Sequence, residues 1–157
     1  MLRLRPLLRG DVPDLVIMSR ENMAAIVKES WGIEWTDEPL LEWLCDGATT
    51  TMVLEEDGDP IGYYSLEVLD SYHFITSIQI RRDKQGRGLG RTMMREIEAT
   101  VLDEGTDGVE LYVQDSNEKA IEFYTSLGYR TICRSGNNFL LRKSATEIVE
   151  EQGNQKD

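Results

Sequence analysis

An apolar strand that runs directly into a basic, glycine-rich turn and then a helix limits most strongly what this chain can fold into. The segment is Phe74 to Met94, which reads FITSIQI, RRDKQGRGLG and RTMM. Its glycines Gly86, Gly88 and Gly90 let the backbone approach a ligand without a Cβ in the way. The first N–H groups of the helix point to the same place, so the segment predicts an anion site whose natural occupant is phosphate.

Cationic side chains crowd this loop although the chain as a whole is acidic. They are Arg81, Arg82, Lys84, Arg87 and Arg91. The 157 residues carry 29 Asp and Glu against 17 Lys and Arg, which gives a formal net charge of -12. A positive island in a negative protein favours a bound anion, while the overall charge makes nucleic acid an unfavourable partner.

The spacing of the loop narrows the kind of phosphate ligand. A P-loop would end in Gly-Lys followed by Ser or Thr, whereas this loop ends in GLGR with no hydroxyl to hold magnesium. A G-x-G-x-x-G dinucleotide pattern that starts at Gly86 or Gly88 requires glycine at Arg91 or Met93. Neither pattern is met.

Two motifs resemble those of the GNAT-type N-acetyltransferases. The first is a Q-x-x-G-x-G loop made of Gln85, Gly86, Arg87, Gly88, Leu89 and Gly90, which resembles the loop that holds the pyrophosphate of coenzyme A in that superfamily. The second runs from Asn117 to Tyr129 and resembles the family signature N-x-x-A-I-x-F-Y-x-x-L-G-Y/F. The resemblance covers Tyr72 to about Arg142 closely, and the N-terminal half only in its order of elements.

The apolar periodicity predicts one α/β domain of the α+β kind. Strands are expected at residues 1–8, 50–55, 61–69, 72–80, 109–114, 129–134 and 139–142, and helices after Asp11 and at 38–45, 89–104 and 118–127. The resemblance implies a mixed central sheet of six to seven strands, with helices on both faces and a V-shaped splay between strands 4 and 5. Residues 1–143 are expected to form the N-acetyltransferase domain, and the polar, acidic residues 144–157 a disordered tail.

The resemblance implies acetyl-CoA as co-substrate. Main-chain N–H groups of Gly86 to Arg91 would hold its pyrophosphate, and its pantetheine arm would pair with the strand edge at Ile78, Gln79 and Ile80. The N–H of Ile78 or Gln79 would face the thioester oxygen. Asn117 resembles the family's coenzyme-contacting asparagine, with a plain helix cap as the alternative. The expected coenzyme-binding residues are therefore Ile78, Gln79, Ile80, Gln85, Gly86, Arg87, Gly88, Leu89, Gly90, Arg91 and Asn117.

Two residues are candidates for proton transfer. Tyr124 lies seven residues after Asn117, as in the family, and is expected to protonate the departing sulfur of coenzyme A. The general base is harder to find, because no carboxylate occurs from Phe74 to Ile80 and Tyr112 stands where the branch that acts on N-terminal alanine has a glutamate. Glu67 is the nearest plausible base, acting directly or through water, with a solvated strand-end acid as the alternative. The single histidine, His73, is expected to be structural or at the surface.

These features predict an enzyme that moves an acetyl group from acetyl-CoA to a primary amine of a small molecule or a protein. A catalytically silent acyl-CoA-binding or sensing domain is the alternative, favoured by the missing standard carboxylates and disfavoured by Tyr124. We expect no metal, because Cys45 and Cys133 have no C-x-x-C or His partner at metal spacing. We expect no membrane partner, because the N-terminal apolar run is interrupted by Arg3, Arg5 and Arg9. A cytoplasmic location and a homodimer through the last hairpin are further expectations. The acid-rich, lysine-poor composition suits a high-salt cytoplasm or a cationic substrate.

Overall fold

The computed structural model describes residues 1–155, which form two compact units. Unit 1 comprises Met1–Glu67 and Ile75–Met93, and unit 2 comprises Val68–Phe74 and the described residues from Met94 onward. Three elements contribute residues to both units, namely strands β3 (Asp59–Leu69) and β4 (Tyr72–Ile80) and helix α3 (Leu89–Glu104). The expected glycine loop lies in unit 1, and the motif that begins at Asn117 lies in unit 2.

The strands form a seven-stranded mixed sheet in the order β1-β2-β3-β4-β5-β7-β6. They are β1 (Leu2–Pro6), β2 (Thr50–Glu56), β3 (Asp59–Leu69), β4 (Tyr72–Ile80), β5 (Gly108–Gln114), β6 (Arg130–Ser135) and β7 (Asn138–Ser144). Strands β4 and β5 are parallel, with His73 opposite Val109 and Phe74 opposite Glu110, whereas β5 and β7 are antiparallel. The prediction of a mixed sheet of six to seven strands is confirmed.

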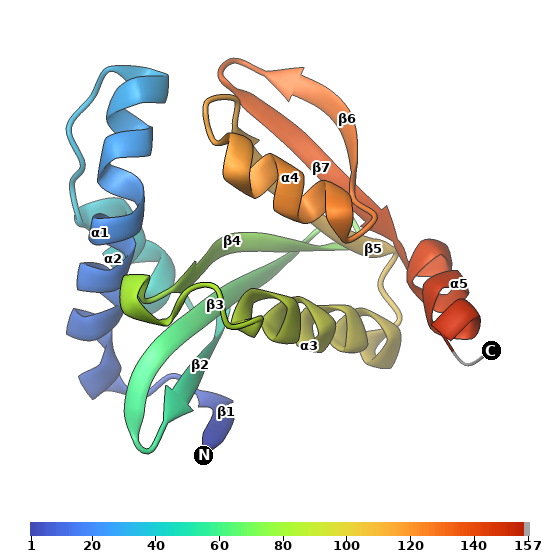
Figure 1. Ribbon diagram of the computed structural model, residues 1–157, viewed down its shortest axis with the longest axis horizontal. Helices are drawn as coiled ribbons and strands as arrows, with labels where there is room; N and C mark the ends of the chain where they lie inside the picture. Colours follow the sequence, from blue (N-terminus) through green and yellow to red (C-terminus); the bar gives the residue numbers. More distant parts are fainter. Residues whose placement is uncertain (156–157) are drawn as a thin grey trace. The chain divides into compact units, whose positions relative to one another are not determined.

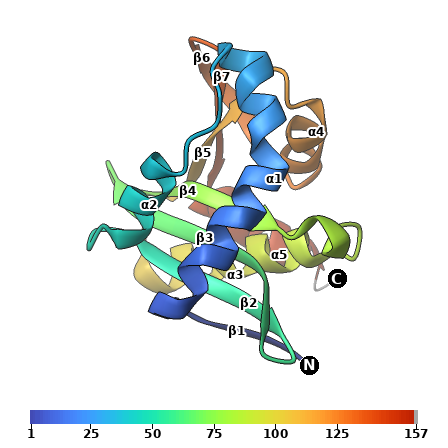
Figure 2. The ribbon, with the colours of Figure 1, turned by 90° about the vertical axis from the view of Figure 1, so that its left-hand side faces the viewer.

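Helices α1 (Val12–Trp31) and α2 (Glu38–Cys45) cover one face of the strands of unit 1, as Figure 2 shows. Helix α1 carries a proline in its first turn and ends at Gly32, whose φ of 68° no β-branched residue adopts readily. The packed cluster on this face consists of Leu15, Val16, Met18, Leu40, Leu44, Val53 and Tyr63. Within residues 1–155 no helix is long and apolar enough to cross a membrane.

The first turns of helix α3 (Leu89–Glu104) lie against the opposite face of β3 and β4. A Cβ built on Gly62 of β3 would lie 2.8 Å from Ile80 Cδ1, 3.0 Å from the Gln79 carbonyl oxygen and 3.7 Å from the Met93 sulfur. Glycine at position 62 therefore lets the end of β4 pack closely on β3. Unit 1 has helices on both faces of its strands, as expected.

Unit 2 packs the rest of α3 with helix α4 (Glu118–Ser126), the β6–β7 hairpin and helix α5 (Ala145–Gln155), all labelled in Figure 1. Its fully or nearly fully buried apolar side chains are Met94, Ile97, Val101, Val109, Leu111, Val113, Tyr124, Tyr129, Leu141 and Ile148. One cation is also buried: Lys143 is 2% exposed, lies 3.1 Å from Glu98 and pairs with Glu151. The two carboxylates offset the cost of burying this ammonium group.

The prediction of a disordered tail is wrong for Ala145–Gln155, which forms α5. Ile148 is 1% exposed in this helix, and Glu151 reaches Lys143 on β7. The acidic residues that suggested disorder occupy the solvated face around one buried apolar position, and this is the pattern of a surface helix. Positions 156 and 157 lie outside the described residues.

Candidate active site

The glycine loop of unit 1 has the backbone geometry of an anion-binding turn. Gly86 and Gly88 have φ angles of 80° and 79°, which residues with a Cβ adopt only at a cost. Apart from the glycine itself and its two chain neighbours, no heavy atom of the described residues lies within 4 Å of a Cβ built on Gly86 or Gly88. Both are exposed. The glycines are therefore required for the path of the backbone, and the space beside them is open to a ligand.

The loop leads into the N-terminus of α3. The Thr92 amide donates to the Gly88 carbonyl oxygen at 3.2 Å, which begins the helical pattern. The amides of Leu89 and Gly90 precede that bond and have no acceptor one turn earlier within the helix. The first turn contains no acidic residue. The positive end of the helix dipole is thus free of a competing carboxylate on its own helix.

The cations of the loop are more tightly paired than the sequence suggests. Arg81 lies 2.8 Å from Asp59 and 2.7 Å from Asp83, and these hydrogen bonds raise the pKa of its guanidinium. Lys84 and Arg87 share Glu56, at 3.1 and 2.8 Å. Glu56 is a site residue that sequence reasoning missed, because it lies on β2, far from the loop in sequence.

Arg87 and Lys84 strongly affect the pKa of the Glu56 carboxyl group. Hydrogen bonds from Arg87 and then Lys84 lower the pKa of its carboxyl from 4.5 to about 2. The carboxylate therefore stays charged at every ordinary pH. The expectation of a positive island needs correction for Arg81, Lys84 and Arg87, which are paired with carboxylates. An anion bound here would depend more on main-chain amides than on these three side chains.

Asn22 of α1 forms hydrogen bonds both with the end of β4 and with the glycine loop. Its Nδ2 donates to Gln79 Oε1 at 3.0 Å and to the Ile80 carbonyl oxygen at 2.7 Å. Gln85 Nε2 donates to the same carbonyl at 3.1 Å and to Asn22 Oδ1 at 3.3 Å. Arg82 adds a hydrogen bond to the carbonyl oxygen of Glu21. Nothing in the sequence signalled Asn22, since its partners lie more than fifty positions away.

These contacts show which of the residues predicted at the edge of β4 are already hydrogen-bonded inside the protein. The Ile80 carbonyl oxygen accepts two side-chain hydrogen bonds, so it is already used inside the protein. The side chains of Gln79 and Gln85 also make internal contacts. Ile78 is half-buried. Its main chain is the part of the predicted edge that best suits a pantetheine amide.

Asn117 occupies the N-cap of α4. Its Oδ1 accepts a hydrogen bond from the Ala120 amide at 3.3 Å, and its carbonyl oxygen accepts from the Ile121 amide at 3.1 Å. The helix-cap alternative is the role that these contacts support. A contact between Asn117 and the coenzyme stays a prediction.

Tyr124 lies inside unit 2. Its side chain is 6% exposed, and its ring makes edge-on contacts with Phe123 and Tyr129, at centroid distances of 5.1 and 5.8 Å. Burial raises the pKa of the Tyr124 phenol well above its ordinary value. The phenol therefore holds its proton at neutral pH, which is the state that a general acid requires.

Glu67 and His73 differ in their hydrogen bonds and ion pairs. Glu67 is half-buried near the end of β3, and within residues 1–155 it makes no hydrogen bond or ion pair. Because side chains alternate along a strand, it points to the same side of β3 as Tyr63 and Ser65. His73 is 3% exposed, with Nδ1 2.6 Å from Thr106 and Nε2 2.5 Å from Glu104. These contacts fit the expected structural role of His73.

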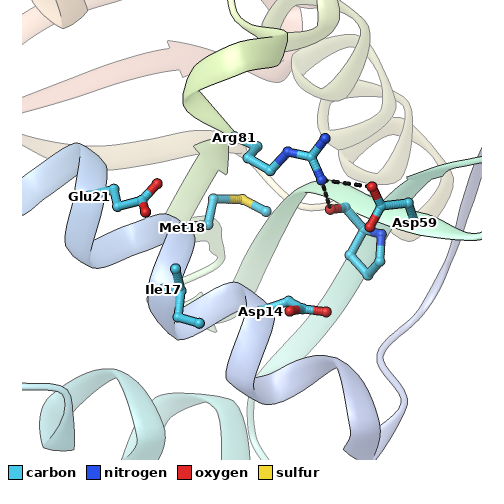
Figure 3. Close-up of a pocket in the computed structure, with 7 residues that line it drawn as sticks. Asp14, Ile17, Met18, Glu21, Asp59 and Arg81 are labelled. Carbon is cyan, nitrogen blue, oxygen red and sulfur yellow. Dashed lines mark hydrogen bonds and ion pairs between the residues drawn. The ribbon is translucent and has the colours of Figure 1, made fainter.

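A small pocket of about 160 Å³ lies between α1, the start of β3 and the end of β4 (Figure 3). It is lined by Asp14, Ile17, Met18, Glu21, Asp59, Pro60 and Arg81. Figure 3 shows Arg81 turned toward Asp59, to which it is hydrogen-bonded. Arg81 also donates a hydrogen bond to the Pro60 carbonyl oxygen. Of the loop residues only Arg81 belongs to this pocket, and its volume suits a small group rather than a coenzyme.

The predicted site residues thus fall into two groups. Glu67 and the residues from Ile78 to Arg91 belong to unit 1, where Asn22 links Gln79, Ile80 and Gln85. Asn117 and Tyr124 belong to unit 2, at the two ends of α4. Among residues 1–155 no group of three or more His, Cys, Asp or Glu side chains is arranged to hold a metal ion.

Comparison with known proteins agrees with the two motifs. A sequence model described as "Acetyltransferase (GNAT) family" matches residues 18–129. A mycothiol acetyltransferase of Tsukamurella paurometabola is 31% identical over 106 residues, which cover 66% of this chain but only 36% of the relative. The chain therefore spans about a third of that relative's length.

A curated relative and a solved structure, both from Thermoplasma acidophilum, match over nearly their whole length. A spermidine N(1)-acetyltransferase is 20% identical over 156 residues, covering 85% of this chain and 96% of the relative. The crystal structure of the PaiA N-acetyltransferase in complex with coenzyme A superposes with a TM-score of 0.75 at 18% identity, covering 92% of this chain and 99% of that one. At this identity the structural likeness establishes the fold.

Proposed function

Because the chain belongs to the acetyltransferase (GNAT) family, we propose that it transfers an acetyl group from acetyl-CoA to a primary amine. The observation that carries the proposal is the left-handed turn at Gly86 and Gly88, which opens onto an N-terminus of α3 without acidic residues. Such a turn suits a diphosphate held by main-chain amides. The solved relative that contains coenzyme A supports acetyl-CoA as the co-substrate.

The acetyl donor would be held at two places in unit 1. Main-chain amides from Gly86 to Gly90 would bind the diphosphate, and the main chain at Ile78, a half-buried residue, would pair with an amide of the pantetheine arm. The N–H of Ile78 or Gln79 would then stabilise the negative charge that develops on the thioester oxygen. The hydrogen bonds of Asn22 and Gln85 support this arrangement, because they fix the end of β4 relative to the loop.

The reaction needs one proton acceptor and one proton donor. As the amine nitrogen attacks the thioester carbon, the C–N bond forms, the C–S bond breaks and the sulfur leaves with the electron pair. Tyr124 would protonate that thiolate, and the raised pKa of its phenol supports the role by keeping the proton in place. Glu67, which has no partner among the described residues, would accept the proton of the amine directly or through water.

The acceptor decides how much the base must contribute. Freeing the lone pair of a lysine-like amine at pH 7 costs about 4 to 5 kcal/mol, whereas an α-amine costs only about 1 kcal/mol. The curated relatives include a spermidine acetyltransferase and an N-terminal acetyltransferase B catalytic subunit, so both kinds of amine belong in a screen. A cytoplasmic location and a homodimer stay predictions.

The decisive experiment measures coenzyme A binding and thiol release together. Calorimetry with coenzyme A and a thiol-release assay with acetyl-CoA would be run with spermidine and with a short peptide that has a free α-amine. Amine-dependent thiol release supports the proposal, and binding without release with any amine supports the silent acyl-CoA-binding domain. Absence of binding rejects both.

A matched pair of glycine variants locates the coenzyme. Gly86→Ala forces a Cβ onto a φ of 80° and is expected to weaken coenzyme A binding at least tenfold. Gly10→Ala adds the same methyl group at a position in unit 1 with ordinary φ and open space, and should leave binding unchanged. Equal binding by both variants would place the coenzyme elsewhere.

A further inference from the structure

Three hydroxyl groups from three elements of unit 1 form a continuous hydrogen-bonded chain. Ser19 Oγ on α1 lies 2.5 Å from the Tyr63 hydroxyl on β3, which lies 2.6 Å from Ser77 Oγ on β4. Ser19 is 1% exposed and Tyr63 is fully buried, whereas Ser77 is half-buried. Of these three hydrogen-bonded hydroxyls, only that of Ser77 reaches the surface.

The contacts fix the direction in which the hydroxyl protons point. The Ser19 hydroxyl donates to the Leu15 carbonyl oxygen at 2.8 Å, so its single proton is used there. Tyr63 must then donate to Ser19, because a buried hydroxyl without an acceptor is costly. Because the single proton of Tyr63 is used toward Ser19, the Tyr63 oxygen must accept the hydrogen bond from Ser77. The Ser77 proton therefore points into the protein, and both lone pairs of Ser77 Oγ stay available as hydrogen-bond acceptors.

This row of three hydrogen-bonded hydroxyls fixes the direction of each hydrogen bond, but it does not conduct protons. It ends at a helix carbonyl oxygen, which cannot pass a proton further. Burial also raises the pKa of Tyr63, so the phenol stays neutral at ordinary pH. The three hydroxyls thus keep Ser77 in one orientation through a catalytic cycle.

Ser77 lies beside the part of β4 that the proposed function assigns to the thioester. It directly precedes Ile78, whose main chain is proposed to bind the coenzyme. It shares a side of β4 with Gln79, because side chains alternate along a strand, and the Gln79 side chain contacts Asn22 of α1. An acceptor lone pair is therefore held on the α1 side of β4, one residue from the proposed oxyanion donor.

Resting on the proposed acetyl transfer, we propose that Ser77 Oγ binds an N–H of the acceptor amine, with Tyr63 and Ser19 as positioning residues. A neutral primary amine has two N–H groups and one lone pair. One N–H donated to Ser77 fixes the rotation of the nitrogen and turns its lone pair toward the thioester carbon. Ser77 takes no proton in this step, since the proton lost by the amine goes to Glu67 or water.

Steady-state kinetics with spermidine and with the free-amine peptide test the inference. In Ser77→Ala we expect the amine KM to rise about tenfold while the Kd for coenzyme A stays within twofold, which is the loss of one hydrogen bond. Ser77→Thr keeps the hydroxyl and should restore the amine KM. Thr76→Val is the matched control, because it removes the neighbouring hydroxyl, which donates to the Ser65 carbonyl oxygen.

Tyr63→Phe separates positioning from general packing. It removes the acceptor of the Ser77 proton with little change of shape, so Ser77 can rotate and the amine KM should rise. In the double variant Tyr63→Phe, Ser77→Ala the KM should be no higher than in Ser77→Ala alone, because the tyrosine acts through the serine. Thermal melts of each variant would confirm that it is folded.

Several outcomes would overturn the inference. An unchanged amine KM in an active Ser77→Ala enzyme would do so while leaving the proposed function intact. An equal KM rise in Thr76→Val would show a general disturbance of β4, and a rise in the Kd for coenzyme A would move Ser77 to the coenzyme site. If the unaltered protein neither binds coenzyme A nor releases thiol, the proposed function fails and the inference fails with it.

Discussion

The Asn22 side chain donates a hydrogen bond of 2.7 Å to the carbonyl oxygen of Ile80, which ties helix α1 to the last residue of β4. The same carbonyl accepts from Gln85 at 3.1 Å, so one oxygen joins the helix, the strand end and the glycine loop. The loop is therefore held by side chains of unit 1 and not by its own residues alone. We infer that the geometry of the anion site depends on Asn22.

Replacing Asn22 should loosen this site. In Asn22→Ala the Ile80 carbonyl and the Gln79 side chain each lose a donor, which costs about 1 kcal/mol per hydrogen bond in unfolding free energy. We expect the Kd for coenzyme A to rise about fivefold. Calorimetry and urea unfolding measure the two effects. Glu29→Gln, at an exposed position of the same helix, is the control and should change neither.

Removing the charge of Glu56 should strengthen the binding of coenzyme A, whereas replacing Asn22 should weaken it. Glu56→Gln releases Lys84 and Arg87 from their shared carboxylate, so both cations become available to a phosphate. We expect coenzyme A to bind about threefold more tightly at low salt, with the gain shrinking at high salt. Glu147→Gln removes an equal charge from the ion pair with Arg130 and serves as the control. Weaker binding by Glu56→Gln would show that Glu56 supports the loop.

The pH dependence of the Glu56 effect follows from its pKa. The carboxyl has a pKa of about 2 in the folded protein against 4.5 ordinarily, so its stabilising pairs are fully present above pH 4.5. That contribution is lost only as the pH falls from there toward 2. The difference in coenzyme affinity between Glu56→Gln and the unaltered protein should thus be constant from about pH 6 to pH 9. A difference that varies in this range would contradict the assignment.

The sequence predicted what depends on local pattern and missed what depends on distant pairs. The strand at Tyr72–Ile80 and the helix at Leu89–Glu104 have the predicted bounds, because apolar periodicity and glycine mark their ends. The partners Glu56 and Asn22 contact the loop from β2 and α1, and no sequence spacing encodes those contacts.

Tyr124→Phe tests the proposed general acid. The ring contacts with Phe123 and Tyr129 stay, so we expect normal folding and coenzyme binding. Turnover should fall about 10²-fold or more, because the thiolate loses its proton donor. Because burial raises the pKa of the Tyr124 phenol above its ordinary value of 10, the unaltered enzyme should show no loss of rate from this phenol up to about pH 10.

Tyr112→Phe is the control for that experiment. Tyr112 is 47% exposed and touches Phe74 edge-on through its ring, which phenylalanine preserves. Its turnover should match that of the unaltered enzyme. Full turnover in Tyr124→Phe would remove Tyr124 from the mechanism.

Two neighbouring residues of α5 test whether this helix belongs to the folded core. Ile148 is 1% exposed and Val149 is 55% exposed, so the two side chains differ in burial within one helix. Ile148→Ala should lower the unfolding free energy by about 2 to 4 kcal/mol, since it leaves a cavity in unit 2. Val149→Ala should change it by less than about 0.5 kcal/mol. Urea unfolding measures both, and equal small effects would mean that α5 contributes no core packing and that Lys143 alone anchors it through Glu151.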